Sequence, residues 1–147
     1  MGEKYMKRIY IAGPMFSAAE LKYNEEIAKK LEVSGFNVFL PQREGYKMVE
    51  LLETMRPEEA RKLIFNKDYE AVKSADIILI ILDGRIIDEG ACVELGIGYV
   101  MGKLCVGLKT DPRTMMNGQM NPMVSECLAA TYSSVDDLVT YICREKM

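Results

Sequence analysis

The spacing of apolar residues divides the chain into alternating strands and helices. The unbroken apolar run from Ile77 to Leu82 is typical of a central parallel strand covered on both faces. Shorter β-branched segments predict further strands, and apolar positions three to four residues apart predict helices. The expected strands are 8–12, 37–40, 76–82 and 104–108, and the expected helices are 17–34, 57–75, 89–101 and 135–144. A loop with a short helix around 48–53 is expected over 42–56, and a second loop over 111–120.

This order of elements predicts an α/β fold. We expect one domain over residues 1–147, a Rossmann/flavodoxin-like sandwich whose mostly parallel sheet has four to five strands. In such folds, ligands bind beyond the carboxyl ends of the strands. The turns expected to form the site are therefore 13–17, 41–46 and 83–90, where Gly13 and Gly90 allow a ligand to approach the backbone.

Composition excludes several classes of function. The 147 residues carry 19 Lys and Arg against 22 Asp and Glu, a net charge of −3, which argues against a nucleic acid polymer as partner. Without histidine, the chain has neither a Ser-His-Asp triad nor a His-ligated metal. No apolar run is long enough for a membrane span and no secretory signal is visible, so we expect a cytoplasmic protein. The four cysteines have neither zinc nor disulfide spacing and are expected to be small buried residues.

Glu94 is the only charged residue between Ala91 and Met101. A helix that is apolar all round is expected to be buried, so this carboxyl group loses solvation and needs a partner or a chemical role. Its position near the helix N-terminus favours an ionised carboxylate, as a nucleophile requires. A buried Glu that caps a neighbouring loop is the alternative, and the spacing gives both interpretations equal weight.

Asp68 is a second carboxylate on an apolar face. It lies on the inward stripe of the helix 57–75, among Ile64, Ala71 and Val72, where Leu would be ordinary. Taken alone, an Asp paired with a buried donor is the simpler interpretation. Two such carboxylates flanking one central strand indicate a shared cleft instead.

Two carboxyl groups without histidine suit the chemistry of glycosidic bonds. One attacks the anomeric carbon while the other protonates the leaving group, and an N-glycosidic bond to a nucleobase fits the same scheme. Clustered acids could instead bind Mg²⁺, with Asp83, Asp88 and Glu89 as candidates, although their spacing matches no loop that we can derive. On its own, Asp88 is explained as an N-cap, and Tyr10 as a core tyrosine with a bonded hydroxyl.

Three motifs resemble the nucleoside 2-deoxyribosyltransferase family. They are Arg8-Ile-Tyr-Ile-Ala-Gly-Pro14, Asn66-Lys-Asp68 followed by Ala75-Asp76, and Asp88-Glu-Gly-Ala-Cys-Val-Glu-Leu-Gly96. The last motif is the most specific, and its Glu follows Asp68 by 26 positions, in agreement with the family. The resemblance extends from about residue 8 to residue 130.

The resemblance implies a role for each matching residue. Glu94 matches the nucleophile, which forms a covalent deoxyribosyl-enzyme at C1′, and Asp68 matches the acid that handles the proton of the base. Tyr10 matches the tyrosine that orients the nucleophile. Asp88 matches the carboxylate that holds the 5′-hydroxyl of the sugar.

The resemblance also implies contacts outside these motifs. Gln42 and Arg43 occupy the position of the base-contacting loop, and Asn121 matches an asparagine that members offer to a neighbouring subunit's site. We therefore expect a homo-oligomer, at least a dimer. A methionine-rich segment beside Asn121 offers the adaptable apolar surface that interfaces use: Met115, Met116, Met120 and Met123.

The resulting hypothesis is a nucleoside salvage enzyme that moves 2-deoxyribose between free nucleobases, without a cofactor or a metal. One alternative is a 2′-deoxynucleoside 5′-monophosphate N-glycosidase, in which water replaces the second base. There a serine stands where this chain has Asp88, so we expect nucleosides to be preferred. A second alternative is a non-catalytic nucleotide-binding module on the same fold. A Lonely-Guy-type phosphoribohydrolase would need a Gly-Gly pair before the helix of Glu94, which is missing.

Overall fold

The computed structural model describes residues 5–113 and 117–145, and its centre is a five-stranded sheet in which all strands are parallel. The strand order is β2-β1-β3-β4-β5. The strands are Arg8–Ala12 (β1), Asn37–Phe39 (β2), Ile77–Ile81 (β3), Leu104–Leu108 (β4) and Ala130–Tyr132 (β5). β3 is buried along its whole length, as its apolar sequence requires. The predicted α/β sandwich is confirmed.

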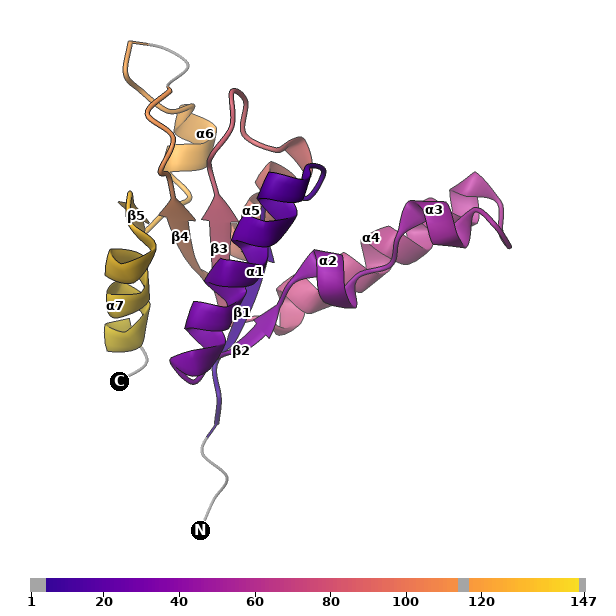
Figure 1. The fold of residues 1–147 in the computed structure, drawn as a ribbon, viewed down its shortest axis with the longest axis horizontal. Coiled ribbons are helices and arrows are strands. Elements are labelled where there is room, and N and C mark those ends of the chain that lie inside the picture. Colours follow the sequence, from indigo (N-terminus) through magenta and orange to yellow (C-terminus); the bar gives the residue numbers. More distant parts are fainter. Residues whose placement is uncertain (1–4, 114–116, 146–147) are drawn as a thin grey trace.

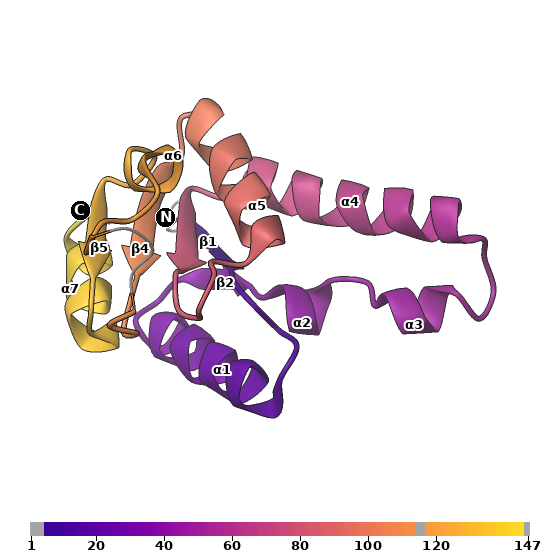
Figure 2. The same ribbon diagram turned by 90° about the horizontal axis from the view of Figure 1, so that it is seen from above.

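Helices cover both faces of the sheet, which gives three layers (Figures 1 and 2). On one face, α1 (Ala18–Val33) and α7 (Val135–Glu145) share a core with the sheet. On the other face, α4 (Pro57–Ser74) and α5 (Glu89–Val100) pack around Tyr10 and Ile78. Three short helices complete the described chain: α2 (Pro41–Glu44), α3 (Met48–Leu51) and α6 (Pro122–Ser125). The strand order reverses between β1 and β3, and ligands bind at such switch points.

Local signals explain where the helices begin and end. Ser17 Oγ accepts a hydrogen bond from Glu20 N at 3.2 Å, and Glu20 Oε2 accepts one from Ser17 N at 3.5 Å, a capping box at the start of α1. Gly35 ends that helix with a φ of 87°, which suits glycine. Asp88 caps α5, because its Oδ2 accepts from Ala91 N at 2.9 Å. The N-cap interpretation of Asp88 is therefore confirmed.

Three elements of the described chain were not predicted individually. They are α2, α6 and β5, with four, four and three residues. A segment this short has too few positions to show a helical or strand period. β5 is at the edge of the sheet, where it pairs with β4 alone. It raises the sheet to the upper end of the expected four to five strands.

An arm formed by α3 and the outer part of α4 projects beyond the sheet (Figure 2). Val49 and Phe65 are exposed on it. The outer side of α5 is open as well, since Val93 is 58% and Val100 is 84% exposed. The expectation that α5 is buried all round is wrong, because the sheet covers one side of this helix and no described segment covers the opposite side.

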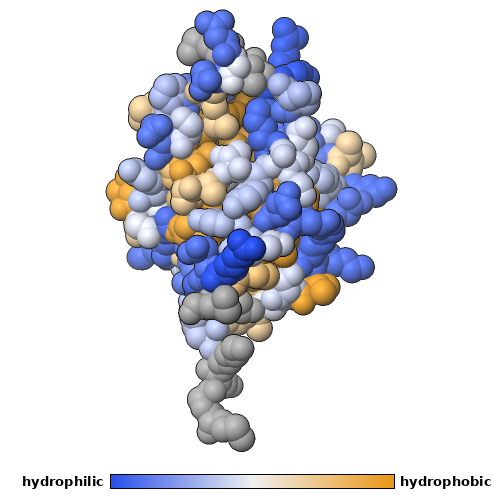
Figure 3. All heavy atoms as spheres, turned by 90° about the vertical axis from the view of Figure 1, so that its left-hand side faces the viewer, coloured by the Kyte–Doolittle hydropathy of each residue, from blue (hydrophilic) through white to orange (hydrophobic). Residues whose placement is uncertain are grey.

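The side of the molecule that carries α7 is mostly hydrophilic, with apolar residues between the polar ones (Figure 3). None of the helices in the described ranges combines the length and apolar character needed to cross a bilayer. All four cysteines are free thiols, and Cys105 alone is fully buried. The expected burial of the cysteines is therefore confirmed for Cys105 and wrong for the other three, which are half-buried.

Candidate active site

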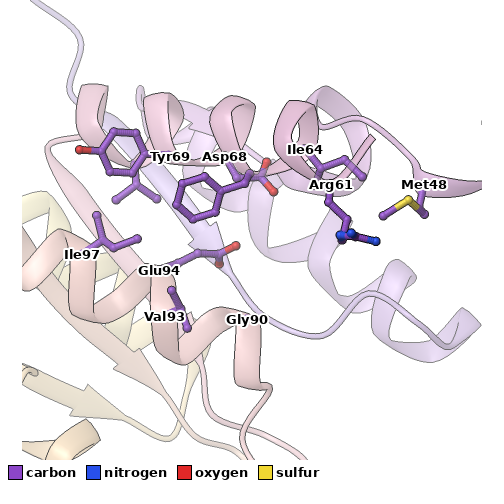
Figure 4. Close-up of a pocket in the computed structure, with 11 residues that line it drawn as sticks. Met48, Arg61, Ile64, Asp68, Tyr69, Gly90, Val93, Glu94 and Ile97 are labelled. Atoms are coloured by element: carbon purple, nitrogen blue, oxygen red, sulfur yellow. The ribbon is translucent and has the colours of Figure 1, made fainter. Parts of the chain in front are cut away.

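A cavity of about 320 Å³ lies between α4 and α5 (Figure 4). Its volume is in the range of small-molecule sites. Asp68 enters it from α4 and Glu94 from α5, and their carboxyl groups point into the same space (Figure 4). The other lining residues are mainly apolar: Met48, Arg61, Ile64, Phe65, Tyr69, Val72, Gly90, Val93 and Ile97. The two carboxylates singled out in the sequence thus share one cavity.

Glu94 is held in place because α5 packs unusually close to β3. A Cβ at Gly98 would lie 2.4 Å from Cγ1 of Ile78, so only glycine fits there. Ala91 and Leu95, on the same side of the helix, are buried against the sheet. Glu94 stands beside this buried stripe, and its side chain therefore leaves α5 toward α4.

Asp68 lies beside the packed side of α4, as Glu94 does on α5. Ala60 and Val72, on the packed side of the helix, are fully buried. Oδ1 of Asp68 is buried and has no hydrogen-bond partner among the described residues. An unpaired buried carboxyl oxygen costs stability, so native structures keep one only for a reason. The simpler interpretation, an Asp bonded to a buried donor, is not what the structure has.

Tyr10 on β1 lies close to both carboxyl groups. Its side chain is completely buried and stacks on Phe39, with ring centroids 5.3 Å apart. Its hydroxyl faces Glu94 but makes no hydrogen bond of normal geometry within the described part of the chain. The expected bonded hydroxyl is therefore absent there. Burial, followed by the charges of Glu94 and Asp68, raises the pKa of Tyr10, so the phenol stays neutral and can donate a hydrogen bond.

Burial also decides the ionisation of the two carboxyl groups. It raises the pKa of Glu94 to about 8, against the lowering effect of the Tyr10 hydroxyl, and the charge of Asp68 adds to the rise. Burial raises the pKa of Asp68 to about 6, opposed by the charge of Lys67. The expected ionised Glu94 is wrong for the free protein at neutral pH. Glu94 is beyond the first turn of α5, where the helix dipole fades, and desolvation outweighs it.

Between these two pKa values the pair of Asp68 and Glu94 holds one proton. One carboxylic acid and one carboxylate in a common cavity form a chemically competent pair, because the carboxylate can attack a carbon while the acid protonates a leaving group. Glu94 has the higher pKa even with the lowering effect of the Tyr10 hydroxyl included, so it holds this proton in the free protein. A closer approach of the Tyr10 hydroxyl would favour the ionised form of Glu94 and move the proton toward Asp68.

Asp88 lines a second cavity, of about 360 Å³, together with Arg85 and the turns that follow β1 and β3. The two cavities are neighbours at the N-terminus of α5. A Cβ at Gly90, which lines the first cavity, would lie 3.3 Å from Oδ2 of Asp88. A ligand that extends from Glu94 along α5 would therefore reach Asp88.

Gln42 and Arg43 are bonded away from the carboxylates. The Nε2 of Gln42 donates to the Leu21 carbonyl at 2.9 Å, and its Oε1 accepts from Asn24 at 2.9 Å. Arg43 forms an ion pair with Glu32 at 2.7 Å. Neither side chain lines the cavity of Asp68 and Glu94. Both residues instead tie α2 to α1.

Gly13 and Asn121 have packing and capping roles in the described chain. A Cβ at Gly13 would lie 3.0 Å from Cβ of Ile81, so the glycine lets the turn after β1 pack on β3. Asn121 Oδ1 accepts from Met123 N at 2.9 Å, which caps α6, and the residue lines a third cavity of about 110 Å³. Met115 and Met116 lie outside the described residues.

The turns predicted to form the site contribute less to the first cavity than the helices do. Of the three turns, Gly90 alone lines it, and the rest of its lining comes from α3, α4 and α5. Three lining residues were not predicted from the sequence: Arg61, Phe65 and Tyr69. Arg61 and Phe65 could have been found by following the face of α4 that holds Asp68 toward the N-terminus, since they are seven and three residues before it.

The acids considered for Mg²⁺ are not assembled into a site. Among the described residues, no three acidic or cysteine side chains come together as metal ligands. Asp83 Oδ1 accepts from Thr110 N at 2.6 Å and from Asp111 N at 2.8 Å. These bonds hold Asp83 against the turn after β4, while Asp88 caps its own helix.

The sequence profile of the family described as nucleoside 2-deoxyribosyltransferase matches residues 9–138. Among solved structures, a conserved protein from Enterococcus faecalis V583 is 25% identical, with a TM-score of 0.80 over 97% of this chain and 100% of that chain. A 2-deoxyribosyltransferase from Bacillus psychrosaccharolyticus is 29% identical, with a TM-score of 0.76 over 91% of each chain. A CMP N-glycosidase from Clostridium botulinum shares the fold, at 19% identity and a TM-score of 0.58 over 95% and 99% of the two chains. No curated protein matches.

Proposed function

The chain belongs to the nucleoside 2-deoxyribosyltransferase family, and we propose that it transfers 2-deoxyribose from one nucleobase to another through a covalent intermediate on Glu94. The observation that carries this proposal is the pair of Asp68 and Glu94 in one cavity, with the buried phenol of Tyr10 beside them. A non-catalytic binding module would bear the cost of desolvating two carboxyl groups without using them. Catalysis at an N-glycosidic bond uses both.

The first half-reaction requires the shared proton to pass from Glu94, which holds it in the free protein, to Asp68, so that the charge is on Glu94. A carboxylate oxygen of Glu94 attacks C1′ of a 2′-deoxyribonucleoside as the C1′–N bond breaks. The electron pair of that bond goes to the base, which takes the proton of Asp68. The free base leaves, and the deoxyribose remains as an ester of Glu94, inverted at C1′. Asp88 lines the neighbouring cavity and in this scheme accepts a hydrogen bond from the 5′-hydroxyl.

The second half-reaction reverses these steps with another base. Its nitrogen attacks C1′ and gives its proton to Asp68, while the bond from C1′ to Glu94 breaks and the electron pair returns to the carboxylate. A second inversion gives net retention at C1′ and restores both side chains. The apolar lining of the cavity limits the access of water to the ester. The scheme requires neither a cofactor nor a metal.

A base-exchange assay tests the proposal. The protein is incubated with deoxyinosine or thymidine and free adenine, and deoxyadenosine is measured by chromatography. Formation of deoxyadenosine that depends on the protein supports transfer. Release of free base from the nucleoside, with no deoxyadenosine formed, would replace transfer with hydrolysis.

Hydrolysis of a 2′-deoxynucleoside 5′-monophosphate is a second candidate, favoured by the likeness to a CMP N-glycosidase and by Arg85, which lines the same cavity as Asp88. Against it stands the charge of Asp88. At about 4 Å and an effective dielectric constant near 20, each pair of like charges repels by about 4 kcal/mol before screening. We therefore expect the nucleoside to be preferred over its 5′-monophosphate, and Asp88→Ser to reduce that preference. A wild-type protein that prefers the monophosphate would favour the hydrolase.

We propose further that the protein acts as at least a dimer in which the outer face of α5 meets a second copy. Val93 and Val100 make this face apolar, and a Cβ added at Gly96 would meet no atom within 4 Å, which leaves room for another helix to approach. Val93 also lines the cavity of the carboxylates. A second copy seated here would therefore help to close that cavity.

A further inference from the structure

We infer that Arg61 makes this site selective for nucleobases with a carbonyl group, rather than an amino group, on the edge remote from the glycosidic nitrogen. The inference rests on the proposed function, since it takes the cavity between α4 and α5 as the place where base and sugar are separated. Of the residues that line this cavity, Arg61 alone is basic. None of the sequence motifs includes it.

The guanidinium group of Arg61 is available to a ligand. Two other arginines nearby are held by acids, since Arg43 pairs with Glu32 at 2.7 Å and Arg56 with Glu59 at 2.9 Å. The side chain of Arg61 has no hydrogen bond and no ion pair with any residue in the described ranges. Its side chain extends toward Met48, at the end of the cavity away from Tyr69 and Ile97 (Figure 4).

The spacing along α4 fits a flat ring between Arg61 and Asp68. The two residues are seven positions apart, which is two helical turns and about 10 Å along one side of the helix. Ile64 and Phe65 lie between them and line the same cavity. A ligand that bridges this distance makes one hydrogen bond of about 2.9 Å at each end. The remaining roughly 5 Å is a length that a nucleobase can span. On the other side of Asp68 the cavity is lined by Tyr69, Val72 and Ile97, none of which is charged, so we place the ring toward Arg61.

The chemistry of the guanidinium group then sets the preference. Its five N–H groups only donate hydrogen bonds, and its charge strengthens each of them. With the glycosidic nitrogen at Asp68 and Glu94, the remote edge of the base faces Arg61. The carbonyl oxygen of hypoxanthine, guanine, uracil or thymine accepts there, whereas adenine and cytosine place an amino donor at the same position and leave only the neighbouring ring nitrogen as an acceptor.

Binding and turnover measurements together test this inference. Calorimetry measures the affinity of wild type, Arg61→Met and Lys62→Met for hypoxanthine against adenine and for uracil against cytosine. The same pairs are then compared as acceptors by kcat/KM with one deoxyribonucleoside donor. Arg61→Met keeps an apolar stem of similar length, and Lys62 is the neighbouring exposed residue that does not line the cavity.

The expected result is a preference for the carbonyl-bearing base of about tenfold or more in each pair. This preference should disappear in Arg61→Met and remain in Lys62→Met. Equal affinities in wild type, a preference that survives in Arg61→Met, or no measurable binding of any base would overturn the inference. Binding needs no turnover, so selective binding through Arg61 without sugar transfer would refute the proposed function alone. Transfer that is indifferent to Arg61 would refute the inference alone.

Discussion

The carboxyl group of Asp68 on α4 raises the pKa of Glu94 on α5 across the cavity that the two residues share. They are 26 positions apart in the sequence, so only the packing of two helices on one face of the sheet brings them together. A charge on Asp68 makes the loss of a proton from Glu94 less favourable, so the titration of the two groups is coupled.

Glu94→Ala should abolish sugar transfer while the fold remains. The loss of a covalent nucleophile costs at least about a thousandfold in kcat/KM, and circular dichroism should be unchanged because no hydrogen bond of the fold is removed. Glu89→Gln, at the exposed start of the same helix, is the matched control and should keep its activity. If Glu94→Ala retains more than about a tenth of the wild-type turnover, Glu94 is not the nucleophile.

Asp68→Asn should slow poor leaving groups more than good ones. An amide keeps the size of the side chain but has no carboxylic proton to give, and general acids contribute about a hundredfold or more. The measurement is kcat for a series of deoxyribonucleosides whose bases differ in basicity, with Glu70→Gln on the exposed side of α4 as control. Equal losses for every base would assign Asp68 a structural role.

Tyr10→Phe should alter the pH profile. The wild-type profile of kcat/KM should be highest between about pH 6 and 8, where the carboxyl pair holds one proton. The Tyr10 hydroxyl lowers the pKa of Glu94, so its removal should move the alkaline limb to higher pH and reduce the maximum by about tenfold. Tyr5→Phe, whose hydroxyl bonds to Asp76 at 2.8 Å, is the control. A lower rate with an unshifted profile would mean that Tyr10 only fills space.

Folding stability should fall as the pH rises through the pKa of Glu94. The pKa increases from 4.5 in the unfolded chain to about 8 in the fold, so the folded state binds the proton more tightly. The stabilising contribution is complete below about pH 4.5 and is lost as the pH passes about 8. Urea unfolding measures the free energy of unfolding of Glu94→Gln and wild type. The difference in favour of Glu94→Gln should grow by up to a few kcal/mol from pH 5 to pH 9. A constant difference at all pH values would contradict the buried, protonated Glu94.

Val100→Glu should weaken self-association by at least about tenfold, because it places a charge on the apolar outer face of α5. Val33→Glu is the matched control, since Val33 is 81% exposed, close to the 84% of Val100, but lies on α1 at the opposite face of the sheet. Sedimentation velocity at micromolar concentration measures both. A wild-type monomer with full activity would exclude the proposed dimer.

The sequence predicted the sheet and the two carboxylates for the same reason. Long apolar runs and faces leave strong periodic signals, and Asp68 and Glu94 stand out because each interrupts such a face. The ionisation of Glu94 was predicted wrongly, because it depends on how much water α4 excludes, and a single helix does not encode that. Gln42 and Arg43 were assigned to the base-contacting loop, yet both side chains bond to residues of α1. The direction of side chains in a short, aperiodic segment depends on tertiary contacts.

The projecting arm gives the cavity two walls of different local stability. The wall of α5 rests on the fully buried strand β3, where we expect amide hydrogens to exchange only when the whole domain unfolds. The wall that carries Arg61 belongs to the outer part of α4, which is backed by the four-residue helix α3 and leaves Val49 and Phe65 in water. We expect such a segment to open by local unfolding at a small fraction of the global free energy. We therefore expect Glu94 to stay fixed while the opposite wall yields, which in the proposed reaction would let bases of different size exchange without disturbing the reacting carbon.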